Sequence, residues 1–263
     1  GNMTYKEFCM FDIYENKREF GDYVFEGIDV DVENRVVTFN DNHEENVDTS
    51  IENNPTYKTI SGVETIMLFK RKKSNEFRVS DGNPLVYALK SIKSWKISTE
   101  DRNAIFDRID DIITKIGVFD TIVVMPSSNP LVKELGNHLM NNNKAKNIIN
   151  HCVVKRLKSD IIDDMPWSGF SNKQMTKIED GFSKMGDYFE SKFFPKDKKI
   201  IDKFETNIFK INKNKDYNTM YNKNVLVIDD TISTGLSLNK CSQIINEQYN
   251  PKSIKQLSLF SDL

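Results

Sequence analysis

The chain has 263 residues, of which 38% are hydrophobic and 29% are charged. This length suits one large domain or two small ones, and the composition excludes a disordered chain. With 37 basic and 39 acidic residues the formal charge is −2, so the charge gives no indication of a nucleic-acid partner. No window has the length of a transmembrane helix or the pattern of a signal peptide. We therefore expect a cytoplasmic protein without a membrane partner.

Neither the cysteines nor the histidines follow a metal-binding pattern. The cysteines are too few and too scattered for a disulfide framework or a zinc site, which indicates reduced thiols. They are Cys9, Cys152 and Cys241. The histidines also lack metal-ligand spacing, and we expect them to be structural. They are His43, His138 and His151.

Short β-prone runs characterise the first 80 residues. They occupy residues 23–25, 28–32, 35–39 and 65–69. Residues 33–34 fit a hairpin turn between two of these runs, and residues 40–59, rich in Asn, Asp and Glu, predict a long solvated loop. We expect residues 1–80 to form a small β-rich subdomain without catalytic residues, followed by an α/β domain over residues 81–263.

Helical patterns follow. Residues 84–93 predict a short helix, and residues 99–116 predict a longer one with a single apolar stripe. Ser98 or Thr99 is the expected N-cap of the longer helix, and Gly117 is expected to end it.

Two apolar runs then predict strands. They cover residues 121–125 and 147–154. Between them, residues 130–140 predict a helix with Asn129 as its N-cap. Ser127 and Ser128 immediately precede that helix, whose free N–H groups would attract an anion.

The most informative stretch is residues 224–238, NVLVIDDTISTGLSL. Four apolar residues lead into the adjacent carboxylates Asp229 and Asp230, then into a turn rich in hydroxyl groups that Gly235 closes. The apolar run fits a strand covered on both faces, and residues 236–248 have helical spacing. Backbone N–H groups at the start of that helix would point at the turn, where a phosphate group would bind well.

This run resembles the binding signature for phosphoribosyl pyrophosphate (PRPP) in type I phosphoribosyltransferases. The resemblance implies that Asp229 and Asp230 hold the ribose hydroxyls and act with a Mg²⁺ cofactor. It also implies that the loop after them wraps the 5′-phosphate. The loop residues are Thr231, Ile232, Ser233, Thr234 and Gly235. Thr231 departs from the family pattern, in which an aliphatic residue is more usual.

The same resemblance gives roles to two other segments. Ser127 and Ser128 match the pyrophosphate loop in position, although residues 126–129 contain no Lys or Arg. The basic segment of Lys155, Arg156 and Lys158 matches a mobile loop that supplies positive charge to the departing pyrophosphate. A solvated charge cluster is the alternative interpretation of this basic segment.

Two regions leave alternatives open. Residues 161–223 match no motif, and their helical stretch over 173–194 carries aromatics that suit core packing; this insertion and the N-terminal region are where we expect the acceptor pocket. Residues 254–260 fit a last parallel strand. However, residues 256–260, QLSLF, also resemble the pentapeptide that binds the bacterial sliding clamp.

The sequence thus predicts an α/β fold with a central, mainly parallel sheet flanked by helices, like that of type I phosphoribosyltransferases. The expected function is transfer of phosphoribose from Mg²⁺-PRPP to a nitrogen acceptor with release of pyrophosphate, as in nucleotide metabolism. The element order is similar to orphan, competence-associated members of that family. The alternatives are a regulatory protein that binds PRPP without transfer, and a replication-associated protein that binds the clamp. A homodimer is left open.

Overall fold

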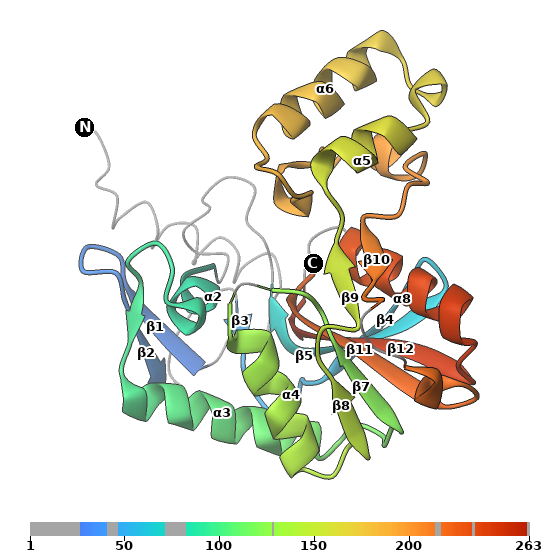
Figure 1. Ribbon diagram of the computed structural model, residues 1–263. Helices are drawn as coiled ribbons and strands as arrows, with labels where there is room; N and C mark the ends of the chain where they lie inside the picture. Colours follow the sequence, from blue (N-terminus) through green and yellow to red (C-terminus); the bar gives the residue numbers. More distant parts are fainter. Residues whose placement is uncertain are drawn as a thin grey trace, which may run out of the picture.

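The computed structural model describes residues 27–40, 47–71, 83–127, 129–213, 217–232 and 235–261 (Figure 1). The main element is a seven-stranded sheet. Its strands are β3 (Val47–Asp48), β4 (Thr56–Ile60), β5 (Val63–Arg71), β7 (Thr121–Val124), β8 (Asn147–Ile149), β11 (Asn224–Thr231) and β12 (Ser253–Phe260). The strand order is β3-β5-β12-β11-β7-β8, with β4 also paired to β5.

The main sheet is largely parallel, as the sequence predicts. From β5 to β8 every neighbouring pair is parallel, whereas β3 and β4 run antiparallel to β5. The apolar run of β11 lies near the middle of this sheet, where Val225, Leu226 and Val227 have no exposed surface. Burial on both faces explains why the strand is continuously apolar rather than alternating.

Helices cover both faces of the main sheet. They are α2 (Asn83–Lys90), α3 (Thr99–Ile113), α4 (Leu131–Asn141) and α8 (Leu236–Tyr249). Leu226 and Ile228 share one hydrophobic core with α2, α3 and α4. Val225 and Val227 face the opposite side, in a second core that contains α8. The two cores are separated by the sheet, which confirms a layered α/β architecture.

The N-terminal hairpin is confirmed, but the strand expected over residues 65–69 lies in the main sheet. β1 (Gly27–Asp31) and β2 (Val36–Asn40) pair antiparallel, and β6 (Lys96–Ile97) adds to β2. β5 lies in the main sheet beside β12, rather than with β1 and β2. A boundary near residue 80 therefore does not separate the strands of the two sheets. The run at residues 23–25 falls outside the described residues.

The solvated loop expected over residues 40–59 is wrong for its described part. β3 and β4 lie within it, and Asp48, Thr49, Ser50 and Asn54 are buried. Local hydrogen bonds make this burial of polar groups favourable, because the Asp48 carboxylate accepts the Ser50 N–H at 2.9 Å and the Asn54 amide donates to the Asp48 carbonyl at 2.8 Å. Composition alone does not reveal a turn whose buried polar groups hydrogen-bond to one another.

The predicted helix starts are accurate to within a residue. The Ser98 hydroxyl accepts the Asp101 N–H at 3.1 Å and caps α3, as expected. α4 begins at Leu131 rather than Pro130, and the Asn129 side chain accepts the Leu131 N–H at 3.0 Å. The predicted end of α3 is wrong, since the helix stops at Ile113 with Thr114 as its C-cap, before Gly117.

Substituting Ser98 with alanine should lower the free energy of unfolding by about 1 kcal/mol, because an N–H in the first turn of α3 loses its acceptor. Ser98→Asp should retain the stability of the parent, since aspartate is also a good N-cap and the start of a helix favours negative charge. Urea unfolding measures both variants. Equal stabilities of Ser98→Ala and Ser98→Asp would contradict the capping role.

The single strand expected over residues 147–154 is wrong. The chain forms β8 at the edge of the main sheet, turns at His151 with φ of 61°, and continues as β9 (Val153–Lys155). β9 pairs antiparallel with β10 (Phe209–Ile211), away from the main sheet. A left-handed residue interrupts an otherwise strand-like apolar sequence, and the only indication in the residue types is that histidine adopts this conformation more often than most residues.

The insertion after β9 is helical, as predicted, and stands away from the main sheet (Figure 1). Its elements are α5 (Lys158–Asp164), η2 (Trp167–Gly169), α6 (Asn172–Ser183), η3 (Ser191–Phe193), α7 (Lys198–Ile201) and η4 (Asn218–Met220). The helix expected up to residue 194 is wrong, because α6 ends at Ser183. The predicted core role is confirmed for Phe182 and Phe189, which are buried with ring centroids 6.2 Å apart, but it is wrong for Tyr188, which is 54% exposed.

Residues 256–260 are part of a central strand and not a tail. Leu257, Leu259 and Phe260 have no exposed surface within β12. A clamp-binding peptide would need these side chains free, so their burial argues against the pentapeptide interpretation. Within the described residues, no helix is long and apolar enough to cross a membrane.

Candidate functional site

The carboxyl ends of β7 and β11 lie side by side in the main sheet, and a cavity lies at each of them. The two strands are neighbours, but the chain after β7 enters α4 on one face, whereas the chain after β11 enters α8 on the other face. Divergent connections of this kind leave an opening between the strand ends, which is where open α/β sheets bind ligands. The two loops that the sequence singles out, after Val124 and after Thr231, flank this opening.

The acidic pair lies at the end of β11, and its two side chains face opposite sides. Successive residues of a strand alternate in direction. Asp230 points toward α2, where its carboxylate is 3.1 Å from the Lys90 ammonium and only 6% exposed. Asp229 points the other way and lines a cavity beside α8. The two carboxyl groups nevertheless lie close to each other, because both the charge of Asp230 and a side-chain hydrogen bond with it contribute to the raised pKa of Asp229.

The environment of Asp229 disfavours its charged form. Burial, and then the negative charge of Asp230, raise the pKa of the Asp229 carboxyl to about 8. The Asp230 N–H donates to the Asp229 carboxylate at 2.8 Å, and the nearby charge of Lys90 also opposes the rise in pKa. Asp229 is thus mostly protonated at neutral pH, and a ligand that donates hydrogen bonds would favour its ionisation.

The cavity at Asp229 is small and polar, with a volume of about 180 Å³. We call it the β11–α8 cavity. It is lined by Ser191, Lys192, Lys196, Asp229, Thr231, Ile232, Gly235, Leu236, Ser237 and Leu238. The Ser237 and Ser191 hydroxyls lie 2.9 Å apart across it. The first turn of α8 and two lysines of the insertion thus face one space, an arrangement suited to an anion.

Gly235 gives the β11–α8 cavity its shape. It is the N-cap of α8 with φ of 77°, a conformation that residues with a side chain rarely adopt. A Cβ atom there would lie 2.7 Å from Cγ2 of Ile60. Ser233 and Thr234, which the sequence assigns to the same turn, fall outside the described residues.

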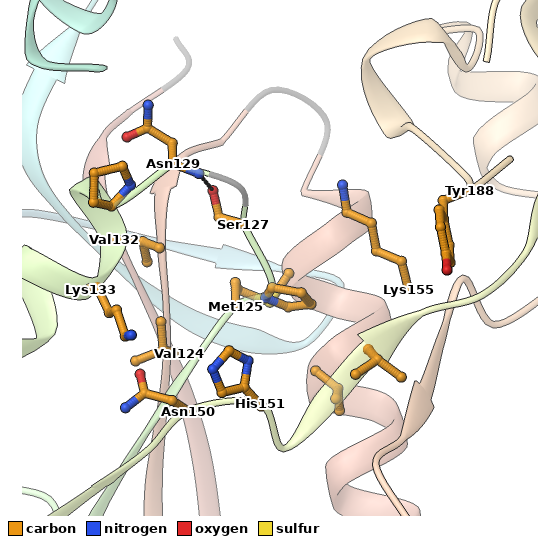
Figure 2. A pocket seen from close by; sticks show the side chains of 14 residues that line it. Val124, Met125, Ser127, Asn129, Val132, Lys133, Asn150, His151, Lys155 and Tyr188 are labelled. Carbon is orange, nitrogen blue, oxygen red and sulfur yellow. Dashed lines mark hydrogen bonds between the residues drawn. The ribbon is translucent and has the colours of Figure 1, made fainter. Parts of the chain in front are cut away.

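A second and larger cavity lies at the end of β7, with a volume of about 620 Å³. We call it the β7 cavity (Figure 2). Its apolar walls include Val124, Met125, Val132, Val153 and Val154. Its polar lining includes Ser127, Lys133, Asn150, His151, Lys155 and Tyr188. The Ser127 hydroxyl accepts the Asn129 N–H at 3.1 Å, and Ser128 is outside the described residues.

The basic segment divides into one residue at a cavity and two in structural contacts. Lys155 lines the β7 cavity. The Arg156 guanidinium pairs with Asp164 and donates to the Asn207 carbonyl at 2.7 Å. Lys158 donates to the carbonyls of Phe182, in the last turn of α6, and Met185, just after that helix, at 3.3 and 3.2 Å. Lys158, which the resemblance places in a mobile loop, is the first residue of α5.

Several side chains near the end of β11 have no signal in the sequence. Lys90, Lys192 and Lys196 approach the end of β11 from segments that match no motif. Only the tertiary fold brings them there. His151, expected to be structural, lines the β7 cavity, whereas His138 is structural as expected, bonded to Asp110 at 2.7 Å and stacked on Phe106.

The side chains present do not form a Mg²⁺ site of their own. Among the described residues, no group of three or more His, Cys, Asp or Glu side chains is placed to hold a metal. Asp230 is paired with Lys90, and the pKa of Asp229 is raised to about 8. Mg²⁺ is commonly held by one or two carboxylates together with substrate phosphates. Here the ion would have to arrive with its ligand.

Cys152 and Cys241 are buried free thiols, and burial raises the pKa of Cys152 to about 12. They offer no nucleophile to either cavity.

No protein-family model matches the chain, and no curated protein matches it.

Proposed function

We propose that the crevice at β7 and β11 binds PRPP, and that the protein is a phosphoribosyltransferase-like enzyme. One observation carries the proposal. Asp229, Thr231, Gly235 and the first turn of α8 line a single cavity at the strand ends, in the order that the PRPP signature requires. Acidic strand ends followed by glycine turns occur in other α/β proteins, but there the carboxylate and the anion-binding turn need not share one cavity.

The β11–α8 cavity would take the ribose 5-phosphate part of PRPP. Its 180 Å³ volume suits a phosphate group with part of the sugar. N–H groups at the start of α8 and the Ser237 hydroxyl would donate to the phosphate, and Lys192 would supply positive charge. Asp229, ionised on binding, would accept from the ribose hydroxyls. Mg²⁺ enters this proposal as the counter-ion of PRPP.

Transfer needs little covalent chemistry from the protein. The bond between ribose C1 and the pyrophosphate oxygen breaks, and its electron pair leaves with pyrophosphate. The lone pair of the acceptor nitrogen forms the new bond to C1, and the nitrogen releases its proton to water. Positive charge at the strand ends would stabilise the leaving group.

The second candidate function is binding of PRPP without transfer. Arg156 and Lys158, two of the three cations expected to act on pyrophosphate, are engaged in structural contacts. The loop after β7 contains no Lys or Arg either. Both observations favour a regulatory protein that senses phosphoribose.

Calorimetry with Mg²⁺-PRPP tests the proposal. The wild-type protein should bind PRPP, and a variant with Asp229→Ala and Asp230→Ala should lose the binding, because the ribose contacts and their charge are removed. Circular dichroism checks that the double variant folds. Lys90 loses its partner in that variant, so Asp229→Asn serves as the second variant and should also bind more weakly.

The outcome separates the candidates. No heat with PRPP or with ribose 5-phosphate from the folded wild type would remove the central proposal. If PRPP binds, release of pyrophosphate across a panel of nitrogen acceptors identifies an enzyme. Binding with no release for any acceptor identifies the regulatory alternative.

A further inference from the structure

The β7 cavity is poorly matched to the inorganic anion that its position suggests. Ser127 and Lys155 line it, but half of its lining residues are valines, prolines and Met125. Its volume of about 620 Å³ is in the range of cavities that hold organic molecules. Pyrophosphate alone would leave the apolar walls in contact with water, whereas a ring system would cover them.

The charge of the lining is positive. Lys133 and Lys155 line the cavity, and none of the described lining residues is acidic. Within the described chain, neither ammonium contacts a carboxylate. In Figure 2, Lys155 lies on one side of the cavity with Tyr188, and Lys133 lies on the other side with Asn150. A ligand that spans this space meets a cation on either side.

Two rings give the cavity flat surfaces. The Tyr188 side chain is 54% exposed although its backbone is fixed by a β-bridge to Leu157. His151 is held in the left-handed conformation, and its carbonyl accepts from the Asn212 amide at 3.0 Å. An exposed aromatic ring on a fixed backbone favours stacking on another planar group, because little conformational entropy is lost on binding.

The β7 cavity adjoins the β11–α8 cavity. Val124 and Ile228 are paired in register, so Met125 of one cavity and Asp229 of the other follow them on neighbouring strands. Residues 188–192 link the two spaces as well, because Tyr188 lines the first and Ser191 and Lys192 line the second. Molecules bound in the two cavities would meet at the strand ends.

We propose that the β7 cavity binds a planar aromatic or heteroaromatic molecule that carries an anionic group, and that this molecule is the nitrogen acceptor. The binding class follows from the cavity itself, and only the role as acceptor rests on the proposed function. The ring covers the valine walls and stacks on Tyr188, and the anionic group pairs with Lys155.

Calorimetry with matched probes tests the binding class. The probes are 2-naphthoate, its neutral isostere 2-naphthamide, acetate and inorganic pyrophosphate. We expect 2-naphthoate to bind about tenfold more tightly than 2-naphthamide, because only the carboxylate makes a charge-assisted hydrogen bond. Acetate should bind much more weakly than either. Equal affinities for the two naphthalene probes, or tighter binding of pyrophosphate in competition with 2-naphthoate, would overturn the proposal.

Variants locate the binding. Lys155→Met should weaken 2-naphthoate binding about tenfold, and Tyr188→Ala should weaken it about fivefold. Lys146→Met is the matched control, since Lys146 is 81% exposed and lies at the opposite end of the main sheet. This variant should bind 2-naphthoate as tightly as the wild type. Equal effects of Lys155→Met and Lys146→Met would place the probe elsewhere and refute the assignment.

The wild-type protein also separates this inference from the proposed function. Binding of 2-naphthoate without binding of PRPP leaves the cavity assignment intact and removes the acceptor role. Binding of PRPP without binding of 2-naphthoate leaves the phosphoribose site intact and overturns the ligand class proposed for the β7 cavity.

Discussion

Affinity for PRPP should rise between pH 7 and pH 8.5 in the wild type and should be nearly constant in Asp229→Asn. The pKa of Asp229 is raised to about 8, chiefly by burial, so the carboxyl is mostly protonated at pH 7. Ribose hydroxyls donate more strongly to the ionised carboxylate, and binding therefore becomes tighter as the proton leaves, by at most about tenfold per pH unit. The 5′-phosphate, with a second pKa of about 6, changes little in this range.

At pH 8.5 Asp229→Asn should bind PRPP about 10- to 100-fold more weakly than the wild type, because a charged acceptor is replaced by a neutral amide. Calorimetry at a series of pH values measures both the pH dependence of PRPP affinity and the loss of affinity in Asp229→Asn. Asp160→Asn, a change of the same type in α5, is the control and should keep the wild-type profile. A wild-type slope retained in Asp229→Asn would exclude Asp229 as the titrating group.

The stability of the ligand-free protein provides a second readout for the same variant. The native pKa of Asp229 lies above its ordinary value of 3.8, so between about pH 4 and pH 8 the native state binds more protons than the unfolded state. The contribution of this carboxyl to the unfolding free energy therefore falls as pH rises through that window, by at most about 1.4 kcal/mol per unit. Asp229→Asn should lack this decrease, which urea unfolding at several pH values measures.

Gly235→Ala should remove most of the PRPP affinity while leaving a folded protein. The left-handed backbone at Gly235 is less favourable by about 1–2 kcal/mol for a residue that has a side chain. The new methyl group, at the start of α8, would also clash with Ile60 of β4. The helix start must shift to relieve this contact. We expect at least a tenfold loss of affinity, since small displacements of a binding group have large effects.

Gly62→Ala is the matched control for Gly235→Ala. Gly62 has a similar φ of 80°, but a Cβ atom there meets nothing within 4 Å. Both variants should therefore lose stability through the same backbone strain. Only Gly235→Ala should lose PRPP binding, and equal affinities of the two variants would separate the helix start from ligand binding.

The sequence was sufficient where local chemistry determines structure. In residues 224–232 and 235–238 the residue types suit their places: apolar residues in a strand covered on both faces, a glycine where φ is positive, and helical spacing after it. The cap at Ser98 and the hairpin of β1 and β2 follow from equally local patterns. Such agreement between neighbouring signals makes prediction reliable.

Prediction from sequence was wrong where contacts between distant parts of the chain determine the structure. The apolar residues 147–154 look like one strand, yet the left-handed turn at His151 sends their second half to β10. Arg156 and Lys158 have the composition of an anion-binding patch, but Asp164 and two carbonyls of the insertion engage them. A charged residue in a sequence does not show whether its side chain is paired with a group elsewhere in the fold.

The pairing of β5 with β12 has a consequence for how the protein forms during synthesis. Thr65 and Gln256, whose side chains lie 3.1 Å apart, are separated by 191 positions along the chain. Until residues 253–260 leave the ribosome, β5 and β11 both lack the strand that lies between them. The main sheet therefore cannot close from the N-terminus onward. Its final step joins two unpaired strand edges across most of the chain, a type of contact that forms slowly and exposes the nascent protein to wrong pairings.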